Sequence, residues 1–354
     1  MGMIKVPQSV IDKFYHHVPE IFESGNLAEG KWNAKLGEFF KSYSGASCAI
    51  PFSSNGAGLL AVLKLLKRYR NFEQIFIQSN TMYGVKTIAI TSGMSYLGAV
   101  PCSFPSLMPT IQQVKEFIIQ LEKPERTVFL LSHIGGIVNP DIEAIAATCK
   151  SSGIALIEDC AHSLGSTLNG RHTGLYGDAG VYSLYATKAI AAGEGGIAVT
   201  NDSELGEMLA RFNIYDRFDQ LQDVGVNFRI SEMQALFSLC MCEMSEEIIF
   251  NKSEIATKYI AACEAADIKY VDPYKNGQRG NHYKFTLIAK VNAGKEFLRI
   301  TSRTSPVYDY TLGDDPDSIA KRHICLPIWY ALENEVIDKT IKQLLCGHED
   351  THNE

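Results

Sequence analysis

The chain has 354 residues, of which 46% are hydrophobic and 21% charged, a composition typical of a globular protein with a sizeable core and about two domains. Its formal net charge of -7 offers no basic footprint for nucleic acid or for an anionic membrane. We find no membrane-length apolar run, no signal-peptide core and no CxxC among nine scattered cysteines, so we expect a cytoplasmic enzyme with free thiols rather than disulfides or a metal site.

From residue 50 to about residue 245, short apolar runs alternate with segments of helical periodicity. Helical spacing is clear over 58–69 and over 142–153, and Gly153 closes the second segment. The runs predicted as strands cover residues 75–78, 127–132, 154–159, 180–185 and 196–201. Such alternation predicts βαβ units and a mostly parallel sheet covered by helices on both faces.

The pattern changes after a helix that Ser231 caps. Residues from 246 onward predict a long helix, a strand over 283–290, a polar turn-rich stretch and a last amphipathic helix over about 333–345. We therefore expect a large domain over 1–245 and a smaller α+β domain over 246–354.

Charged residues follow two of the predicted strands. Glu158 and Asp159 end the run 154–159, and Lys188 follows the run 180–185. Ligands of an open α/β sheet lie at the carboxyl ends of its strands, so these groups are candidates for a shared site. A desolvated lysine can also form a Schiff base with an aldehyde. The alternatives are that Asp159 caps a helix and that Lys188 is a surface residue at a helix start.

A glycine-bearing loop, "SSNGAGLL", leads into the first clear helix. Its Gly56 and Gly58 could bring backbone N–H groups to an anion, although an ordinary capped helix fits the same letters. A second glycine run, Gly193 to Gly196, lets the backbone pass close to a ligand. A phosphate cradle, a strand-end carboxylate and a desolvated lysine together are what pyridoxal 5'-phosphate (PLP) requires.

Four segments carry a resemblance to a known family: "EGKWNAKLGEFFKSYSGASCAIPFSSNGAGLL", "HIGGIVNPDIEAIAATCKSSGIALIEDCAHSLGS", "GDAGVYSLYATKAIAAGEGGIAVTND" and "GVNFRISEMQALFSL". The chain resembles the DegT/StrS sugar aminotransferases. The resemblance implies the PLP-dependent transferase fold type I, with a mostly parallel seven-stranded sheet in the large domain. It also implies a homodimer with shared active sites and an N-terminal segment, residues 1–30, near the active site.

The resemblance assigns roles to the matching residues. Lys188 is similar to the Schiff-base lysine that also moves the substrate proton, and Asp159 to the partner of the pyridine nitrogen. His162 stands near the cofactor's phenolic oxygen. The phosphate would be held by the Ser183 hydroxyl, the backbone around Gly56 and Ala57, and Asn227 of the neighbouring subunit.

The chain also departs from the family pattern. Gly56-Ala57-Gly58 replaces the usual Gly-Thr-Ala and removes one hydroxyl. The ring-stacking aromatic follows a threonine in the family, whereas "NTMYG" places Met82 there and Tyr83 one residue later; we expect Tyr83 to cover the ring. Candidates for substrate contact are His133, Glu194, Arg229 and Tyr308, with Tyr310 beside the last, and packing roles are the alternative for each.

These assignments predict transfer of an amino group from glutamate to a keto sugar in amino-sugar or polysaccharide biosynthesis, with a nucleotide-linked 4-keto-6-deoxyhexose as the leading candidate. A 3-keto sugar or a keto-cyclitol is an alternative substrate. A catalytically idle regulator is a further alternative, disfavoured by intact Lys188, Asp159 and Ser183. Dehydratases of the family carry histidine in place of the lysine, and the absence of GxGxxG disfavours a nicotinamide enzyme.

Overall fold

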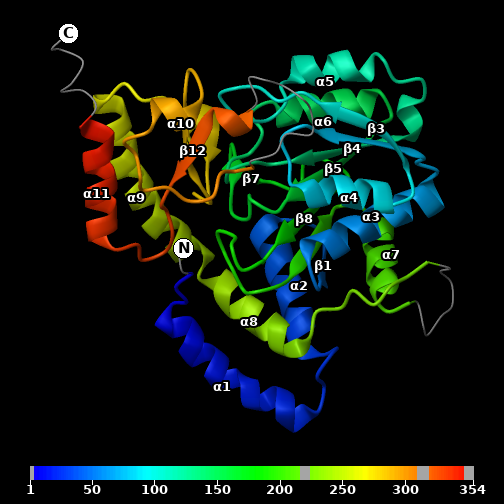
Figure 1. Ribbon diagram of the computed structural model, residues 1–354. Coiled ribbons are helices and arrows are strands. Elements are labelled where there is room, and N and C mark those ends of the chain that lie inside the picture. Colours follow the sequence, from blue (N-terminus) through cyan, green and yellow to red (C-terminus); the bar gives the residue numbers. More distant parts are fainter. Residues whose placement is uncertain (1–3, 216–223, 309–318, 347–354) are drawn as a thin grey trace.

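The computed structural model describes residues 4–215, 224–308 and 319–346. A seven-stranded sheet with the strand order β1-β9-β8-β5-β4-β2-β3 forms the centre of the larger unit (Figure 1). Only β9 runs against its neighbours; all other adjacent pairs are parallel. The strands are β1 (Cys48–Phe52), β2 (Gln74–Gln78), β3 (Ser95–Val100), β4 (Thr127–Ser132), β5 (Ala155–Cys160), β8 (Ala179–Ser183) and β9 (Gly196–Thr200).

Helices cover both faces of this sheet, as Figure 1 shows for α5 and α6 on one side and α3 and α4 on the other. The N-terminal helix α1 packs against α8. The helices of this unit are α1 (Gln8–Ser24), α2 (Lys31–Ser44), α3 (Asn55–Arg70), α4 (Tyr83–Thr91), α5 (Ile111–Ile118), α6 (Ile142–Ser151), α7 (Ser203–Asn213) and α8 (Glu232–Glu243), with a 3₁₀ turn at Pro124–Arg126.

The sequence of β4 explains why helices cover both faces of the sheet. Successive side chains of a strand point to opposite faces. Val128 and Leu130 join the core beneath α3 and α4, whereas Phe129 and Leu131 join the core beneath α5 and α6, and all four are fully buried. An unbroken apolar run is therefore the signature of a strand buried on both faces, as the sequence predicted for 127–132.

A separate hydrophobic cluster lies in the C-terminal part of the chain, between α9 and the antiparallel pair of strands β11 and β12. Its elements are α9 (Ser245–Ala265), β11 (Phe285–Ile288), α10 (Ala293–Glu296), β12 (His323–Leu326) and α11 (Asn334–Leu345), with 3₁₀ turns at Lys275–Gly277 and Ile319–Lys321. A small sheet of β10 (Gln278–Arg279), β6 (Thr167–Leu168) and β7 (Arg171–His172) joins this part to the larger unit. The domain boundary expected at residue 245 coincides with the start of α9 and stays a prediction.

The sequence analysis did not predict β1 and β3 of the central sheet, which contain the strand-disfavouring residues Pro51 and Gly98. It also did not predict the short strands β6, β7, β10 and β12. The predicted strand 180–185 is shorter in the structure and ends at Ser183, since the chain turns there toward Gly193. No helix in the described ranges combines the length and the apolar character needed to cross a membrane.

Candidate active site

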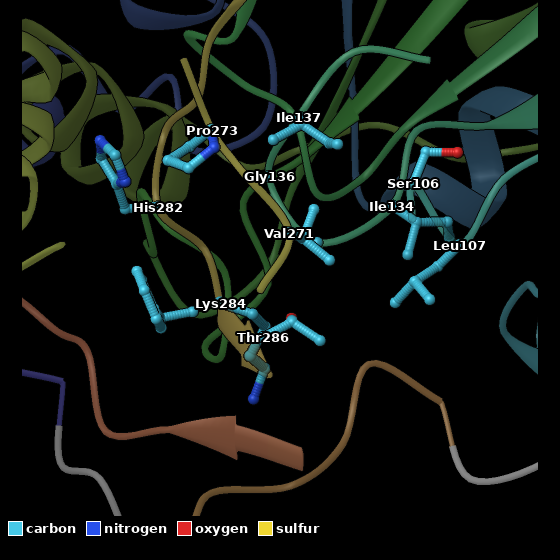
Figure 2. A pocket seen from close by; sticks show the side chains of 12 residues that line it. Ser106, Leu107, Ile134, Gly136, Ile137, Val271, Pro273, His282, Lys284 and Thr286 are labelled. Carbon is cyan, nitrogen blue, oxygen red and sulfur yellow. The ribbon is translucent and has the colours of Figure 1, made fainter. Parts of the chain in front are cut away.

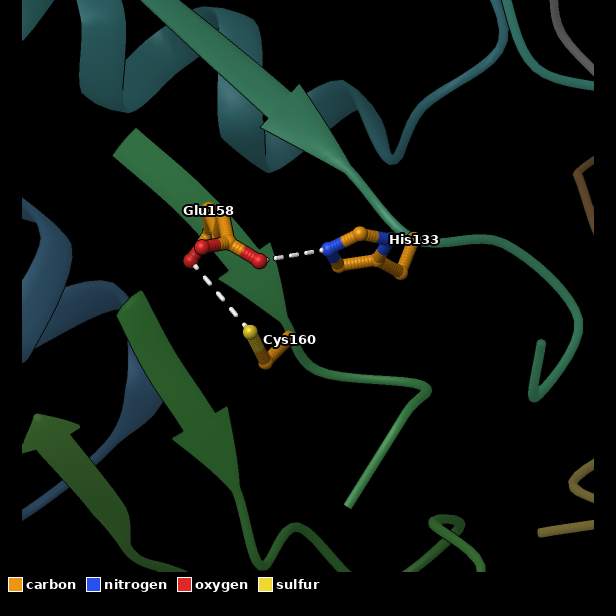
Figure 3. Close-up of side chains that lie close together, drawn as sticks. All are labelled: His133, Glu158 and Cys160. Atoms are coloured by element: carbon orange, nitrogen blue, oxygen red, sulfur yellow. Dashed lines mark hydrogen bonds and ion pairs between the residues drawn. The ribbon is translucent and has the colours of Figure 1, made fainter. Parts of the chain in front are cut away.

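The two acidic residues at the end of β5 point to opposite faces of the sheet. Glu158 is fully buried and accepts N–H groups from Gly174, Tyr176 and Gly177 at 2.7–2.8 Å. Its fourth donor is His133, whose Nε2 lies 2.8 Å from Oε2 (Figure 3). Glu158 thus fixes the turn before β8 and has no role in the crevice.

His133 was a candidate for substrate contact, but its surroundings favour a structural role. Its ring is fully buried, and its Nδ1 accepts the N–H of Asn139 at 3.0 Å. Nε2 therefore carries the proton and donates to Glu158. Cys160 lies beside this pair, donates to the Glu158 carbonyl at 3.6 Å, and has a thiol pKa raised well above its usual value by burial (Figure 3).

Asp159 occupies the other face, at the strand's carboxyl end. It is 4% exposed, and no helix follows it, which excludes the helix-capping alternative. Its Oδ1 accepts from Asn55 Nδ2 and from the N–H of Ala161, and its Oδ2 accepts from Ser132 Oγ, each at 3.1 Å. All three donors are neutral, and no cation lies within 4 Å of this carboxylate in the described ranges. A buried carboxylate of this kind needs a cationic partner.

The N-terminal end of α3 contacts Asp159 through Asn55. Ser54 caps the helix and takes the N–H of Ala57 at 3.1 Å, so the capped-helix interpretation is correct and engages one N–H expected to bind phosphate. The N–H groups of Asn55 and Gly56 precede any intrahelical acceptor and stay available to an anion. Asn55 also donates to the Val181 carbonyl at 2.8 Å, which ties the helix start to β8.

Ser183 and the second glycine run complete this corner. Ser183 ends β8, is 4% exposed, and pairs with Gly196 of β9. A Cβ on Gly196 would lie 2.4 Å from the backbone of Ser54, so only glycine permits this approach. The structure thereby brings Ser183, Gly56 and Ala57 to one edge of the sheet, where we expected the phosphate.

Lys188 lies in the loop between β8 and β9, not in a helix. Its N–H donates to the Tyr185 carbonyl at 2.9 Å, and Gln234 of α8 holds the loop through the carbonyls of Ala192 and Glu194 at 2.6 and 2.7 Å. Burial, together with the charge of Lys284, lowers the Lys188 pKa to about 8, against the opposing pull of Asp159. A lysine so placed holds and releases a proton near neutral pH.

A segment from the C-terminal part of the chain covers Lys188. The N–H of Asn281 donates to Gly136 at 2.9 Å and that of Lys284 to Gly135 at 3.1 Å, and Figure 2 shows the loop after β4 facing residues 271–286. At Gly136, with φ at 98°, a Cβ would lie 2.4 Å from the Asn281 side chain. Tyr283 is thereby held with its ring 5.3 Å from Lys188 Nζ.

His162 is buried between two tyrosines. Its ring centroid is 4.2 Å from that of Tyr283 and 5.2 Å from that of Tyr308, which is stacked on it. Nδ1 accepts the Gly135 N–H at 3.4 Å, and Nε2 lies 2.7 Å from the Tyr308 hydroxyl. Burial and the nearby Lys188 hold the His162 pKa well below its usual value. A neutral imidazole therefore donates from Nε2 to Tyr308.

The remaining candidates lie outside this cluster. Met82 and Tyr83, at the start of α4, are 41% and 61% exposed, and the fully buried Thr81 before them bonds Ser132 at 2.8 Å, so both side chains stay candidates for covering the ring. Glu194 is exposed. Tyr310 lies outside the described residues.

Asn227 and Arg229 follow the gap in the described ranges. Asn227 is exposed, and its Oδ1 accepts the Arg229 N–H at 3.4 Å. Arg229 pairs with Glu29 at 2.9 Å and reaches the Asn213 carbonyl, which favours a structural ion pair over substrate contact.

These residues fit PLP. Among the described residues no cation pairs with the buried Asp159, and a protonated pyridine nitrogen would supply one. The N–H groups of α3 and the Ser183 hydroxyl are suited to hold a phosphate. Lys188 supplies an amine of lowered pKa. Fold and site together define a PLP-binding enzyme of the aminotransferase type.

Comparison with known proteins agrees. Residues 8–302 match the model of the DegT/DnrJ/EryC1/StrS aminotransferase family, so the chain belongs to this family of PLP-dependent sugar aminotransferases. A DegT DnrJ EryC1 StrS aminotransferase from Brucella abortus is similar in fold, with a TM-score of 0.86 and 20% identity over 98% of this chain and 99% of that one. DesV from S. venezuelae gives 0.85 and 19%, over 98% and 99%. PseC from Helicobacter pylori, an aminotransferase involved in the biosynthesis of pseudoaminic acid, gives 0.81 and 19%, over 98% of each chain.

Sequence reasoning missed several residues of this site. Asn55 and Ser132 hold Asp159, and Tyr283 and Lys284 come from a segment more than ninety residues farther along the chain. Asn55 lies within the glycine-bearing loop, directly before Gly56, so the motif could have pointed to it. The other three reveal themselves only through long-range contacts, for which local spacing carries no signal.

Proposed function

We propose that this protein transfers an amino group from glutamate to a nucleotide-linked keto sugar, with a 4-keto-6-deoxyhexose as the leading candidate. The observation that carries the proposal is the pair of Lys188, with its pKa near 8, and the buried Asp159, which lacks a cation among the described residues. A keto-cyclitol or a 3-keto sugar would use the same residues. The intact pair disfavours an idle regulator.

Different residues of the chain would have different roles in this reaction. When bound, PLP supplies an electron sink for the negative charge that develops on the substrate carbon. Lys188 takes a proton from that carbon and returns it, because both of its protonation states are populated near neutral pH. Asp159 would hold a proton on the ring nitrogen of the cofactor, and Asn55 and Ser132 keep the carboxylate in place. Gly56, Ala57 and Ser183 orient the phosphate end.

The proposal also covers the oligomeric state and the subcellular location of the protein. We propose a homodimer in which Asn227, exposed in one subunit, reaches the phosphate end of the neighbouring site. Met82 or Tyr83 would cover the ring from the side of α4. A cytoplasmic location fits the free cysteines, eight of which are buried or half-buried, since thiols persist in reducing compartments.

The deciding experiment is a panel of nucleotide-linked 3-keto and 4-keto sugars, each incubated with the holoenzyme and glutamate, with products identified by mass. We expect one of the 4-keto-6-deoxyhexoses to gain an amino group and glutamate to be consumed in equal amount. The matched control is the Lys188→Ala variant on the same panel. Absence of turnover on every nucleotide-linked sugar would contradict the proposed substrate class.

A further inference from the structure

A lysine interrupts the apolar stripe of α9. Buried residues of this helix recur at helical spacing, with Ile248 and Ile249 before the lysine and Ile255 and Tyr259 after it. Lys252 falls on the same stripe and is 3% exposed. A charged residue at a core position of an amphipathic helix requires a partner.

The Lys252 side chain borders a cavity of about 550 Å³, within the range of small-molecule sites. Five cationic residues and no carboxylate are found among its described lining residues. The cations are Lys5, Lys188, Lys252, Lys284 and Arg303. Lys188 lines this cavity, whereas Asp159 and His162 are not among its described lining residues.

Most of these cations have partners within the protein. Lys5 pairs with Glu333 at 2.7 Å, and Arg303 donates to the Ile300 carbonyl at 2.5 Å. Lys284 donates to the backbone and hydroxyl oxygens of Ser305 at 2.9 and 3.0 Å, and no described residue supplies an anion for its charge.

Lys252 itself has no hydrogen-bond or ion-pair partner in the described ranges. Burial and the charge of Lys284 lower its pKa to about 7. His282 is held neutral, because burial and the charges of Lys252 and Arg279 lower its pKa to about 3. A buried ammonium in this state is costly unless an anion completes the site.

We propose that Lys252 and Lys284 form a subsite for an oxyanion of the substrate, beside the reacting nitrogen of Lys188. The oxyanion is either a carboxylate of the amino donor or a phosphate of the nucleotide on the keto sugar. This inference rests on the proposed function, because it assigns to that function's substrates the residues that hold their charge. Arg303 and Trp329 line the same cavity and bound the space that the anion enters.

Two unreactive probes test the subsite on the holoenzyme: glutarate for the carboxylate and inorganic pyrophosphate for the phosphate. Binding is followed by calorimetry and by the fluorescence of Trp329 at the cavity wall. The test variant is Lys252→Met, which keeps the side-chain length and removes the charge. Lys252→Gln serves as a second uncharged variant should the first fold poorly. The control is Lys258→Met, an exposed lysine of the same helix.

We expect Lys252→Met to weaken one probe at least tenfold, with the same rise in KM for the matching substrate, and Lys258→Met to stay within twofold of the wild type. Loss of glutarate binding assigns the subsite to the amino donor; loss of pyrophosphate binding assigns it to the nucleotide. Unchanged binding of both probes by both uncharged variants would overturn the inference. Failure of the proposed function is distinct, since it shows as absent turnover in the wild type.

Discussion

Glu158 and Asp159 are neighbours in β5, both buried, and yet they have opposite surroundings. Glu158 is saturated by four N–H donors from its own chain. Asp159 receives three neutral donors and no cation among the described residues. The comparison teaches that a buried charge satisfied within the protein is structural, whereas one left without a counter-charge marks where a ligand completes the fold.

The same distinction separates the lysines. Lys5 is paired with Glu333, whereas Lys188 and Lys252 have lowered pKa values and no anionic contact in the described ranges. Mutations on the two sides of this comparison should therefore differ in kind. Substitution of a charge that is paired within the protein should alter stability. Substitution of a charge without a counter-charge among the described residues should alter ligand binding and catalysis.

The largest effect is expected from Lys188→Ala. Lys188 is the single lysine between β8 and β9, and its removal should reduce transamination by more than about 10⁴-fold, the upper range for a proton-transfer group. The visible absorbance of bound cofactor should also disappear. Thermal melting should change little, since Lys188 has no ion-pair partner to lose in the described ranges. Wild-type absorbance in the purified variant would refute the assignment.

The next largest effect on catalysis is expected from Asp159→Asn. The amide still accepts from Asn55 but carries no charge for the ring nitrogen, so kcat should fall about 10²- to 10³-fold, as for loss of one electrostatic contact in other enzymes. The melting temperature should stay near that of the wild type. Steady-state kinetics with the best keto sugar measures the fall in kcat. An unaltered kcat would contradict the role given to Asp159.

Glu158→Gln should give the opposite outcome. A glutamine must turn an NH₂ group toward two N–H donors, so the free energy of unfolding should fall by about 3 kcal/mol. Denaturant titration measures the loss. The folded fraction should retain kcat within a factor of about two, because this carboxylate lies on the far face of the sheet. A large loss of kcat with intact stability would reverse the roles given to the two acids.

The pH dependence of cofactor uptake probes Lys188 more finely. Its pKa of about 8 lies below the ordinary lysine value of 10.5, and only the neutral amine attacks an aldehyde. The initial rate at which the apoenzyme gains visible absorbance should therefore rise with pH up to about 8 and then level off. A rate still rising steeply at about pH 10 would indicate an ordinary, solvated lysine.

The smallest effect is expected for the stability of ligand-free Lys252→Met. Since the folded-state pKa of Lys252, about 7, lies below its unfolded value, the unfolded state binds the proton more tightly and stability rises with pH above 7. The variant should lack this rise and should gain about 1 kcal/mol at pH 7. Chemical denaturation at pH 7 and 9 provides the measurement, and a destabilised variant would show that Lys252 has an internal partner.

Sequence reasoning found the elements with strong local signals. The strand 127–132 agrees with β4 to the residue, and Asn55 at the start of α3 contacts both Asp159 and the Val181 carbonyl of β8. The roles assigned to Lys188, Asp159, Ser183 and Gly56 stay predictions. It could not decide which of two adjacent acids faces the crevice, because that depends on strand register. It overlooked Tyr283 and Lys284, which reach the site through the contacts of Gly135 and Gly136 with a distant segment.

Lys252 shows a signal that was present but not used. The lysine sits at helical spacing among isoleucines, and this pattern alone indicates a buried charge. What the spacing does not supply is the cavity, which several segments far apart in the chain build together. Periodicity reports burial along one element, whereas a binding site is a property of several elements.

The most direct test of the central claim is chemical labelling of the lysine that carries the cofactor. The holoenzyme is treated with borohydride, digested, and mapped by mass spectrometry for the added phosphopyridoxyl group. Our account predicts the label on the peptide containing Lys188 and on no other. Label on Lys252 or Lys284, the other two lysines of lowered pKa at this cavity, or on no lysine at all, would contradict it.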